Sequence, residues 1–218
     1  MKKNNLFFRK PFKYCYINAT LILIIINCIV FAVSFIFPKI YEYINYYGAL
    51  NVVLIDYGHM FWQFITYMFI HGNISHLFFN MLALMIFGFT VERTMGSKEF
   101  ILYYFVCGFL GGLFSYFIYK MTGNYFVRLL GASGAIYSLL FAYAVLYPRS
   151  KVYVWGILPI PSPILVLVYT VIEIISQLGG NDGVAHMTHL FGFVSGWIYF
   201  MVRMGINPIR VWKDAYKE

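Results

Sequence analysis

Charged residues are scarce in this chain of 218 residues: they make up 11%, against about a quarter of a typical soluble domain. Apolar residues make up 61%, aromatic residues make up 22%, and the mean hydropathy is +0.74. This composition excludes an ordinary soluble domain and predicts a protein that crosses a membrane several times. The net charge of +8 does not by itself indicate a nucleic-acid partner, because membrane proteins concentrate Lys and Arg in their cytoplasmic segments. We therefore expect the lipid bilayer, and no nucleic acid, as a partner.

Cysteine is also scarce, and its odd number excludes a fully paired disulfide framework. We interpret Cys15, Cys28 and Cys107 as small core residues, not as metal ligands. The chain contains no low-complexity linker and no detectable internal repeat. The missing repeat argues against a small transporter built from two similar halves.

Six apolar runs predict six membrane-spanning helices. The run at 164–177 is the shortest and follows the helix-breaking prolines Pro159, Pro161 and Pro163. The aromatic stretch between the first two runs is too interrupted to cross and is predicted to be a long, membrane-embedded first loop. The runs have the approximate bounds 17–37, 74–90, 99–119, 130–147, 164–177 and 184–204.

We predict an all-α polytopic membrane protein with three parts. Residues 1–14 form a basic cytoplasmic N-terminus, 15–205 form a six-helix bundle, and 206–218 form a cytoplasmic tail. Only Lys39, Lys120 and Arg128 among the basic residues fall on the side opposite the termini. Because basic residues mark the cytoplasmic side, both termini are predicted to lie inside.

This topology brings the polar side chains of three runs to one depth near the outer membrane face. Ser133 opens the fourth run, His76 and Asn80 open the second, and His186 and His189 open the sixth. Polar groups in a membrane core are costly and usually face the bundle interior or a water-filled cavity. The shared depth therefore predicts a polar site at the outer end of the bundle.

Ser133 lies among small residues, Gly131-Ala132-Ser133-Gly134, at the start of a helix. Such a serine can be a packing residue or a nucleophile, and a nucleophile needs an adjacent base. His189 is the candidate base, because Gly192 and Gly196 follow it on one stripe of a helix that can dock closely. The alternative for each histidine is a structural hydrogen bond, and His186 is expected nearer the rim.

None of the acids near the outer layer, Asp56, Glu173 and Asp182, has a spacing that predicts a third member of a triad. The sequence therefore predicts a Ser–His dyad. Tyr137 lies four residues after Ser133 on the same helix face and could stack on the imidazole.

His76 and Asn80 are also four residues apart and suit an oxyanion hole, together with the Ser133 backbone N–H. Their alternative role is to hold the outer loop together, and His59 and His71 are predicted to be loop or interface residues. Zinc held by His71-x4-His76 and His186-x2-His189 is the rival chemistry. The chain has no His-Glu-x-x-His motif, so we expect no metal and no other cofactor.

These motifs resemble the rhomboid family of intramembrane serine proteases over about residues 15–205. The resemblance implies Ser133 as nucleophile, His189 as general base, His76 and Asn80 as oxyanion donors, and the fifth helix as a lateral gate. Two departures are Gln63 where the family often has Arg after Trp, and Thr188 where Ala is common before the histidine. The motifs are Gly131-x-Ser133-Gly134-x-x-Tyr137, His189-x-x-Gly192-x3-Gly196, His71-x4-His76-x3-Asn80 and Gly88-x3-Glu92-x3-Gly96.

The sequence thus predicts a serine endopeptidase that cleaves single-span or polytopic membrane proteins near the outer membrane face. The alternative is a non-catalytic rhomboid-like protein that binds the helices of membrane proteins. A multi-pass location in a bacterial plasma membrane is the expected setting.

Overall fold

The computed structural model describes residue 9 and residues 12–154, 156–179 and 185–217. Lys2, Lys3, Lys10, Asp182 and the predicted start of the sixth run at residue 184 lie outside the described residues. So does most of the predicted turn at 179–183.

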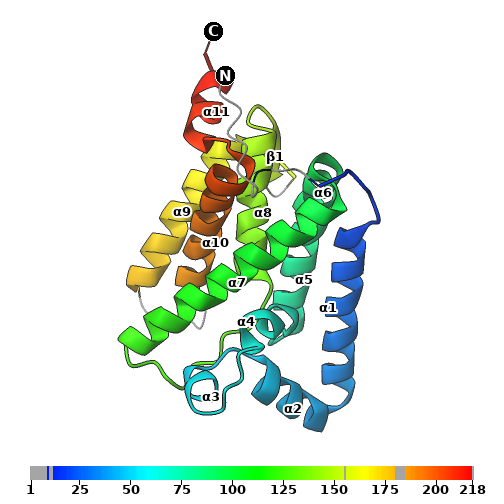
Figure 1. Ribbon diagram of the computed structural model, residues 1–218, viewed down its shortest axis with the longest axis vertical. Coiled ribbons are helices and arrows are strands. Elements are labelled where there is room, and N and C mark those ends of the chain that lie inside the picture. The colour runs from blue at the N-terminus through cyan, green and yellow to red at the C-terminus, as the bar shows by residue number, and fades with distance from the viewer. Residues whose placement is uncertain (1–8, 10–11, 155, 180–184, 218) are drawn as a thin grey trace.

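The chain folds into a helical bundle in which α8 lies in the middle (Figure 1). In that view α9 and α10 lie on one side of α8, α5 and α1 lie on the other, and α7 crosses in front. The helices are α1 (Ala19–Ile36), α2 (Pro38–Gly48), α3 (Val52–Asp56), α4 (Gln63–Thr66), η2 (Tyr67–Phe69), α5 (Ile74–Ala83), η3 (Leu84–Gly88), α6 (Phe89–Met95), α7 (Ser97–Met121), α8 (Ser133–Leu146), α9 (Ser162–Gly179), α10 (His186–Tyr199), η4 (Phe200–Met204) and α11 (Pro208–Ala215).

Four helices of the described chain are long and apolar enough to cross a membrane: Ala19–Ile36, Ile74–Met95, Ser97–Met121 and Ser162–Gly179. The 14 residues of α8 extend about 21 Å, which is less than the roughly 30 Å hydrocarbon core. The prediction that the fifth run is the shortest is wrong, because α9 has 18 residues and α8 has 14. Six crossings and the inside location of both termini remain predictions.

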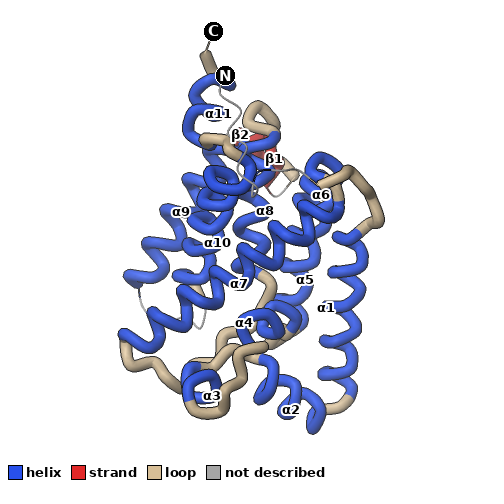
Figure 2. Tube along the Cα trace, viewed as in Figure 1, coloured by secondary structure: helices blue, strands red, loops and turns tan. Residues whose placement is uncertain are grey.

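A β-hairpin corrects the all-α prediction (Figure 2). Strand β1 (Lys151–Val154) pairs antiparallel with β2 (Leu158–Pro161), between α8 and α9. Val152, Tyr153 and Val154 favour a strand, and Pro159 and Pro161 are tolerated because a two-stranded ribbon has only edges. Two of the three prolines that we interpreted as a helix-breaking entry, Pro159 and Pro161, therefore lie in a strand, and Pro163 is the second residue of α9, which begins directly after that strand.

The predicted first loop contains α2, α3, α4 and η2, so much of it is helical. Gln63, which stands where the family often has Arg, is fully buried there. Its Nε2 donates to the carbonyls of Tyr46 and Tyr47 at 3.2 and 3.3 Å, and its Oε1 accepts from the Asn51 backbone N–H at 3.1 Å. The glutamine amide thus anchors the segment by both of its polar atoms.

A buried carboxylate joins α1 to the turn between α6 and α7. Glu92 accepts from the backbone N–H groups of Ala19 and Thr20 at 2.6 and 2.8 Å, at the N-terminus of α1. It also accepts from the Ser97 hydroxyl at 2.5 Å. A carboxylate at a helix N-terminus satisfies free N–H groups and complements the helix dipole.

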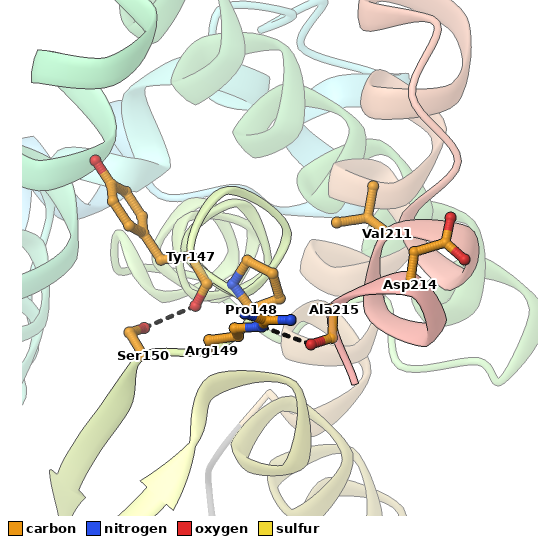
Figure 3. Close-up of a pocket in the computed structure, with 7 residues that line it drawn as sticks. All are labelled: Tyr147, Pro148, Arg149, Ser150, Val211, Asp214 and Ala215. Carbon is orange, nitrogen blue, oxygen red and sulfur yellow. Dashed lines mark hydrogen bonds between the residues drawn. The ribbon is translucent and has the colours of Figure 1, made fainter. Parts of the chain in front are cut away.

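The two ends of the described chain lie at the same end of the bundle (Figure 1). The Arg9 guanidinium donates to the Val202 carbonyl at 3.2 Å, and Arg149 donates to the Ala215 carbonyl at 2.6 Å. The predicted tail contains α11, whose Trp212 Nε1 donates to the Ala144 carbonyl at 2.9 Å near the C-terminal end of α8. A pocket between these two elements (Figure 3) is lined by Tyr147, Pro148, Arg149, Ser150, Val211, Asp214 and Ala215, at the opposite end of α8 from Ser133.

Candidate active site

Ser133 is the first residue of α8, and the turn before it is held in place by a glycine. Gly131 has φ +111°, a conformation that L side chains rarely adopt, and its N–H donates to the Tyr67 carbonyl at 2.9 Å. The turn thus ties the N-terminal end of α8 to η2. It leaves Ser133 partly buried at the start of the most buried helix of the bundle.

His189, on the first turn of α10, faces this serine. Its Nε2 lies 2.8 Å from Ser133 Oγ, which is hydrogen-bond distance. The Tyr137 ring stacks on the imidazole, with 4.2 Å between ring centroids and 9° between ring planes. The structure therefore brings together the three residues that the spacing singled out on two separate helices.

Small residues allow α10 to approach α8 closely. A Cβ built on Gly192 would lie 2.3 Å from the Gly134 carbonyl oxygen, and one on Gly134 would lie 3.0 Å from the Thr188 methyl group. A Cβ on Gly196 would lie 2.6 Å from the Tyr103 hydroxyl. The predicted close docking of the sixth run on the start of the fourth is confirmed.

For the endopeptidase predicted from the sequence, replacing Gly192 by alanine is expected to lower kcat about 100-fold. The new methyl group would meet a backbone carbonyl at 2.3 Å, so α10 must move by about 1 Å, and a shift of that size at the predicted Ser133–His189 pair would cost roughly 10²-fold. The measurement is cleavage of a model transmembrane substrate in detergent. Gly179→Ala is the matched control, because a Cβ there meets no atom of the described residues within 4 Å, and equal losses in both variants would contradict the docking argument.

His76 and Asn80 reach the same turn from α5. A Cβ on Gly131 would lie 2.5 Å from His76 Nε2 and 3.6 Å from Asn80 Nδ2, so both polar atoms end beside the Gly131–Ser133 turn. Asn80 Nδ2 is buried and has no hydrogen-bond partner within the described part of the chain. A buried donor without a partner is costly to keep, and it is free for an acceptor that this structure does not contain.

His71 lies in the loop before α5, as predicted, but it is buried and its ring contacts the His76 ring edge-on at 5.0 Å. Burial lowers the pKa of His71 to about 4, and the neighbouring His76 adds to the effect. His71 is therefore a neutral packing partner of His76 near pH 7.

Sequence reasoning considered Glu173 near the outer layer but assigned it no role. This residue of α9 is 4% exposed, and its Oε1 lies 3.0 Å from His189 Nδ1. Its Oε2 lies 2.5 Å from His186 Nδ1, and the Tyr137 hydroxyl donates to Oε1. His186 is buried against this carboxylate at the first position of α10, three residues nearer the end of that helix than His189.

The other two acids considered near the outer layer do not join this group. Asp56 pairs with Lys120 at 2.6 Å, and Asp182 lies outside the described residues. The ligand atoms of Glu173, His186 and His189 all lie within 4.8 Å of one another, so this cluster has the spacing that a metal ion would need.

A family model described as the Rhomboid domain matches residues 58–205, more than half of the chain. The chain belongs to the rhomboid family. Membership and the apolar helices together make it an integral membrane protein.

Curated relatives agree with the family match at modest identity. RHOMBOID-like protein 4 of Arabidopsis thaliana is 28% identical over 166 residues, which is 76% of this rhomboid chain and 39% of the relative. Rhomboid protein 1, mitochondrial, of Saccharomyces cerevisiae is 28% identical over 167 residues, 73% of this chain and 47% of the relative. Rhomboid protease GluP of Bacillus subtilis is 38% identical over 94 residues, 43% of this chain and 17% of the relative.

The chain spans less than half the length of each of these three relatives. They come from a plant, a fungus and a bacterium, and one is mitochondrial. The bacterial plasma membrane therefore stays a prediction, as do the bounds 15–205 for the rhomboid domain.

Proposed function

We propose that this protein is an intramembrane serine endopeptidase that cleaves the transmembrane helices of other membrane proteins. The observation that carries the proposal is the 2.8 Å contact between Ser133 Oγ and His189 Nε2 at one end of an apolar bundle. An alcohol is a weak nucleophile at neutral pH and becomes effective when an adjacent base takes its proton. Membership of a family that includes a named protease, GluP, supports the same reaction class.

In the proposed mechanism Ser133 Oγ attacks the scissile carbonyl carbon while its proton passes to His189 Nε2. The carbonyl oxygen becomes an oxyanion that accepts from Asn80 Nδ2, His76 and the Ser133 backbone N–H. The C–N bond then breaks, the imidazolium gives its proton to the leaving amine, and an ester to Ser133 remains. Water, deprotonated by His189, hydrolyses that ester and returns Ser133 to its hydroxyl form.

The substrate in this proposal is a single-span or polytopic membrane protein that enters from the bilayer. A peptide bond within a helix is shielded, so the substrate must unwind locally before Ser133 can reach its carbonyl. Helix-breaking residues near the cleaved bond would lower the cost of unwinding. The orientation predicted from the basic residues places this cleavage near the outer membrane face.

A fluorophosphonate tests the proposal on the purified protein in detergent. Ser133 Oγ is expected to displace fluoride from phosphorus, so that mass spectrometry finds the phosphonyl group on the peptide that contains Ser133. Labelling and loss of cleavage of a model transmembrane substrate should advance in parallel, and a chelator should change neither.

Three outcomes would contradict the proposal. Cleavage that a chelator abolishes would indicate metal chemistry at Glu173, His186 and His189. Cleavage that persists after complete labelling of Ser133 would exclude this serine as the nucleophile. Tight binding of the substrate without any cleavage would favour the non-catalytic helix binder.

A further inference from the structure

The outer half of α9 buries one polar residue in the bundle. α9 is described throughout, and after Val166 its only buried residue is Glu173. Its neighbours Ile172 and Ile174 are 49% and 45% exposed on the surface of the bundle. Burying a carboxylate at this depth costs free energy unless the charge is paired. Specific contacts with α8 and α10 must therefore offset the cost of burying Glu173.

Those contacts surround the imidazole of His189. Glu173 Oε1 lies 3.0 Å from His189 Nδ1 and accepts from the hydroxyl of Tyr137, whose ring stacks on the same imidazole. Glu173 Oε2 lies 2.5 Å from His186 Nδ1. The carboxylate therefore lies next to Nδ1 and also holds the tyrosine that lies against the face of the imidazole.

The contact at Nδ1 decides which ring nitrogen can act as a base. Nε2 can take the Ser133 proton only if it carries none itself, so the neutral ring must hold its proton on Nδ1. A carboxylate beside Nδ1 favours this tautomer and stabilises the imidazolium that forms during the reaction. In this conformation the Nδ1–H direction is poorly aligned with Oε1, and catalytic hydrogen bonds often tighten only when substrate binds.

We propose that Glu173 is a positioning residue for His189, so that the site is a Ser133–His189–Glu173 triad contributed by α8, α10 and α9. This inference rests on the proposed function, and it replaces the dyad that the sequence predicted. A further consequence is that the alignment of the base depends on α9: moving the outer half of this helix away from α10 would remove the carboxylate from Nδ1.

Glu173→Gln is the first test, because it keeps the volume and removes the charge. We expect kcat to fall about 100-fold with KM changed less than threefold, since the carboxylate does not touch substrate. The acidic limb of the pH–kcat profile should move to lower pH, because the imidazolium loses its anionic neighbour. The other titratable groups that face the imidazole, Tyr137, His186 and His76, are not substituted in this variant.

Glu42→Gln is the matched control, since it removes a carboxylate from an exposed position on α2 and should leave kcat and the pH profile unchanged. Glu173→Asp keeps the charge and should retain more activity than Glu173→Gln. A purely structural role would lower the thermal stability of the Glu173 variants but would not move the pH profile of the molecules that remain folded.

A spectroscopic measurement separates this inference from the proposed function. With ¹⁵N-labelled histidine, the unmodified protein should show His189 in the Nδ1–H tautomer, and Glu173→Gln should show a mixture of tautomers. This measurement does not require cleavage. If the protein proved inactive, the proposed function would be wrong, but the tautomer of His189 would still test whether Glu173 positions the imidazole. An Nε2–H tautomer in the unmodified protein, or an unchanged kcat and pH profile in Glu173→Gln, would overturn the positioning role.

Discussion

Replacing Ser133 by alanine is expected to slow cleavage of a transmembrane substrate by about 10⁶-fold, to the background of the detergent solution. The hydroxyl is the only group that the proposed mechanism joins covalently to the substrate, and its loss also leaves His189 without a proton to accept. Residues that act as one unit show non-additive losses, so His189→Ala and the double variant should be about as slow as Ser133→Ala alone. The measurement is single-turnover cleavage followed by mass spectrometry of the products.

The fold should survive this change, because the Ser133 side chain loses one hydroxyl and the helix keeps its backbone hydrogen bonds. Ser138→Ala is the matched control on the same helix: Ser138 is fully buried and its hydroxyl donates to the Ala135 carbonyl at 2.6 Å. We expect Ser138→Ala to keep a rate within tenfold of the unmodified protein. A Ser133→Ala variant that cleaves at a comparable rate would exclude Ser133 as the nucleophile.

The contact between Ser133 and His189 could be predicted from the sequence because two local patterns agree on it. Hydrophobic runs and basic residues place both side chains at one depth, and Gly192 allows the two helices to approach at that depth. The stack of Tyr137 on the imidazole follows from the same reasoning, since a spacing of four residues keeps Tyr137 on the face of Ser133. Depth and helical face together are enough to pair residues on helices that dock through small residues.

The role of Glu173 could not be found in this way, because it depends on the rotation of α9 about its own axis. No spacing within α9 relates Glu173 to His189 on the next helix, and the apolar residues around it resemble those of any lipid-facing helix. What could have marked it is the cost of a lone carboxylate within an apolar run. The hairpin was missed for a related reason: Val152 and Tyr153 form a strand only because a partner strand follows the turn.

Replacing Asn80 by alanine is expected to lower kcat by about 10³-fold, at the upper end of the loss seen when one oxyanion donor is removed. The reason is the position of Asn80 Nδ2, which lies beside the turn that carries Ser133 and has no acceptor among the described residues. Asn80 Nδ2 forms no hydrogen bond to the described residues of the free protein, so its hydrogen bond to the substrate is strongest when negative charge develops on the carbonyl oxygen. KM should therefore change little, and the loss should appear in kcat.

Thermal unfolding distinguishes this role from the alternative in which Asn80 holds the outer loop. Because Nδ2 makes no hydrogen bond within the described chain, Asn80→Ala should leave the unfolding temperature nearly unchanged while kcat falls about 10³-fold. Asn80→Asp should be at least as slow as Asn80→Ala, since a carboxylate replaces the donor with a group that repels an oxyanion. Phe79→Ala, at a neighbouring position that is 58% exposed, should keep its kcat. A variant of Asn80 that loses stability and keeps its kcat would assign the residue to the loop, and the oxyanion would then depend on His76 and the Ser133 backbone N–H.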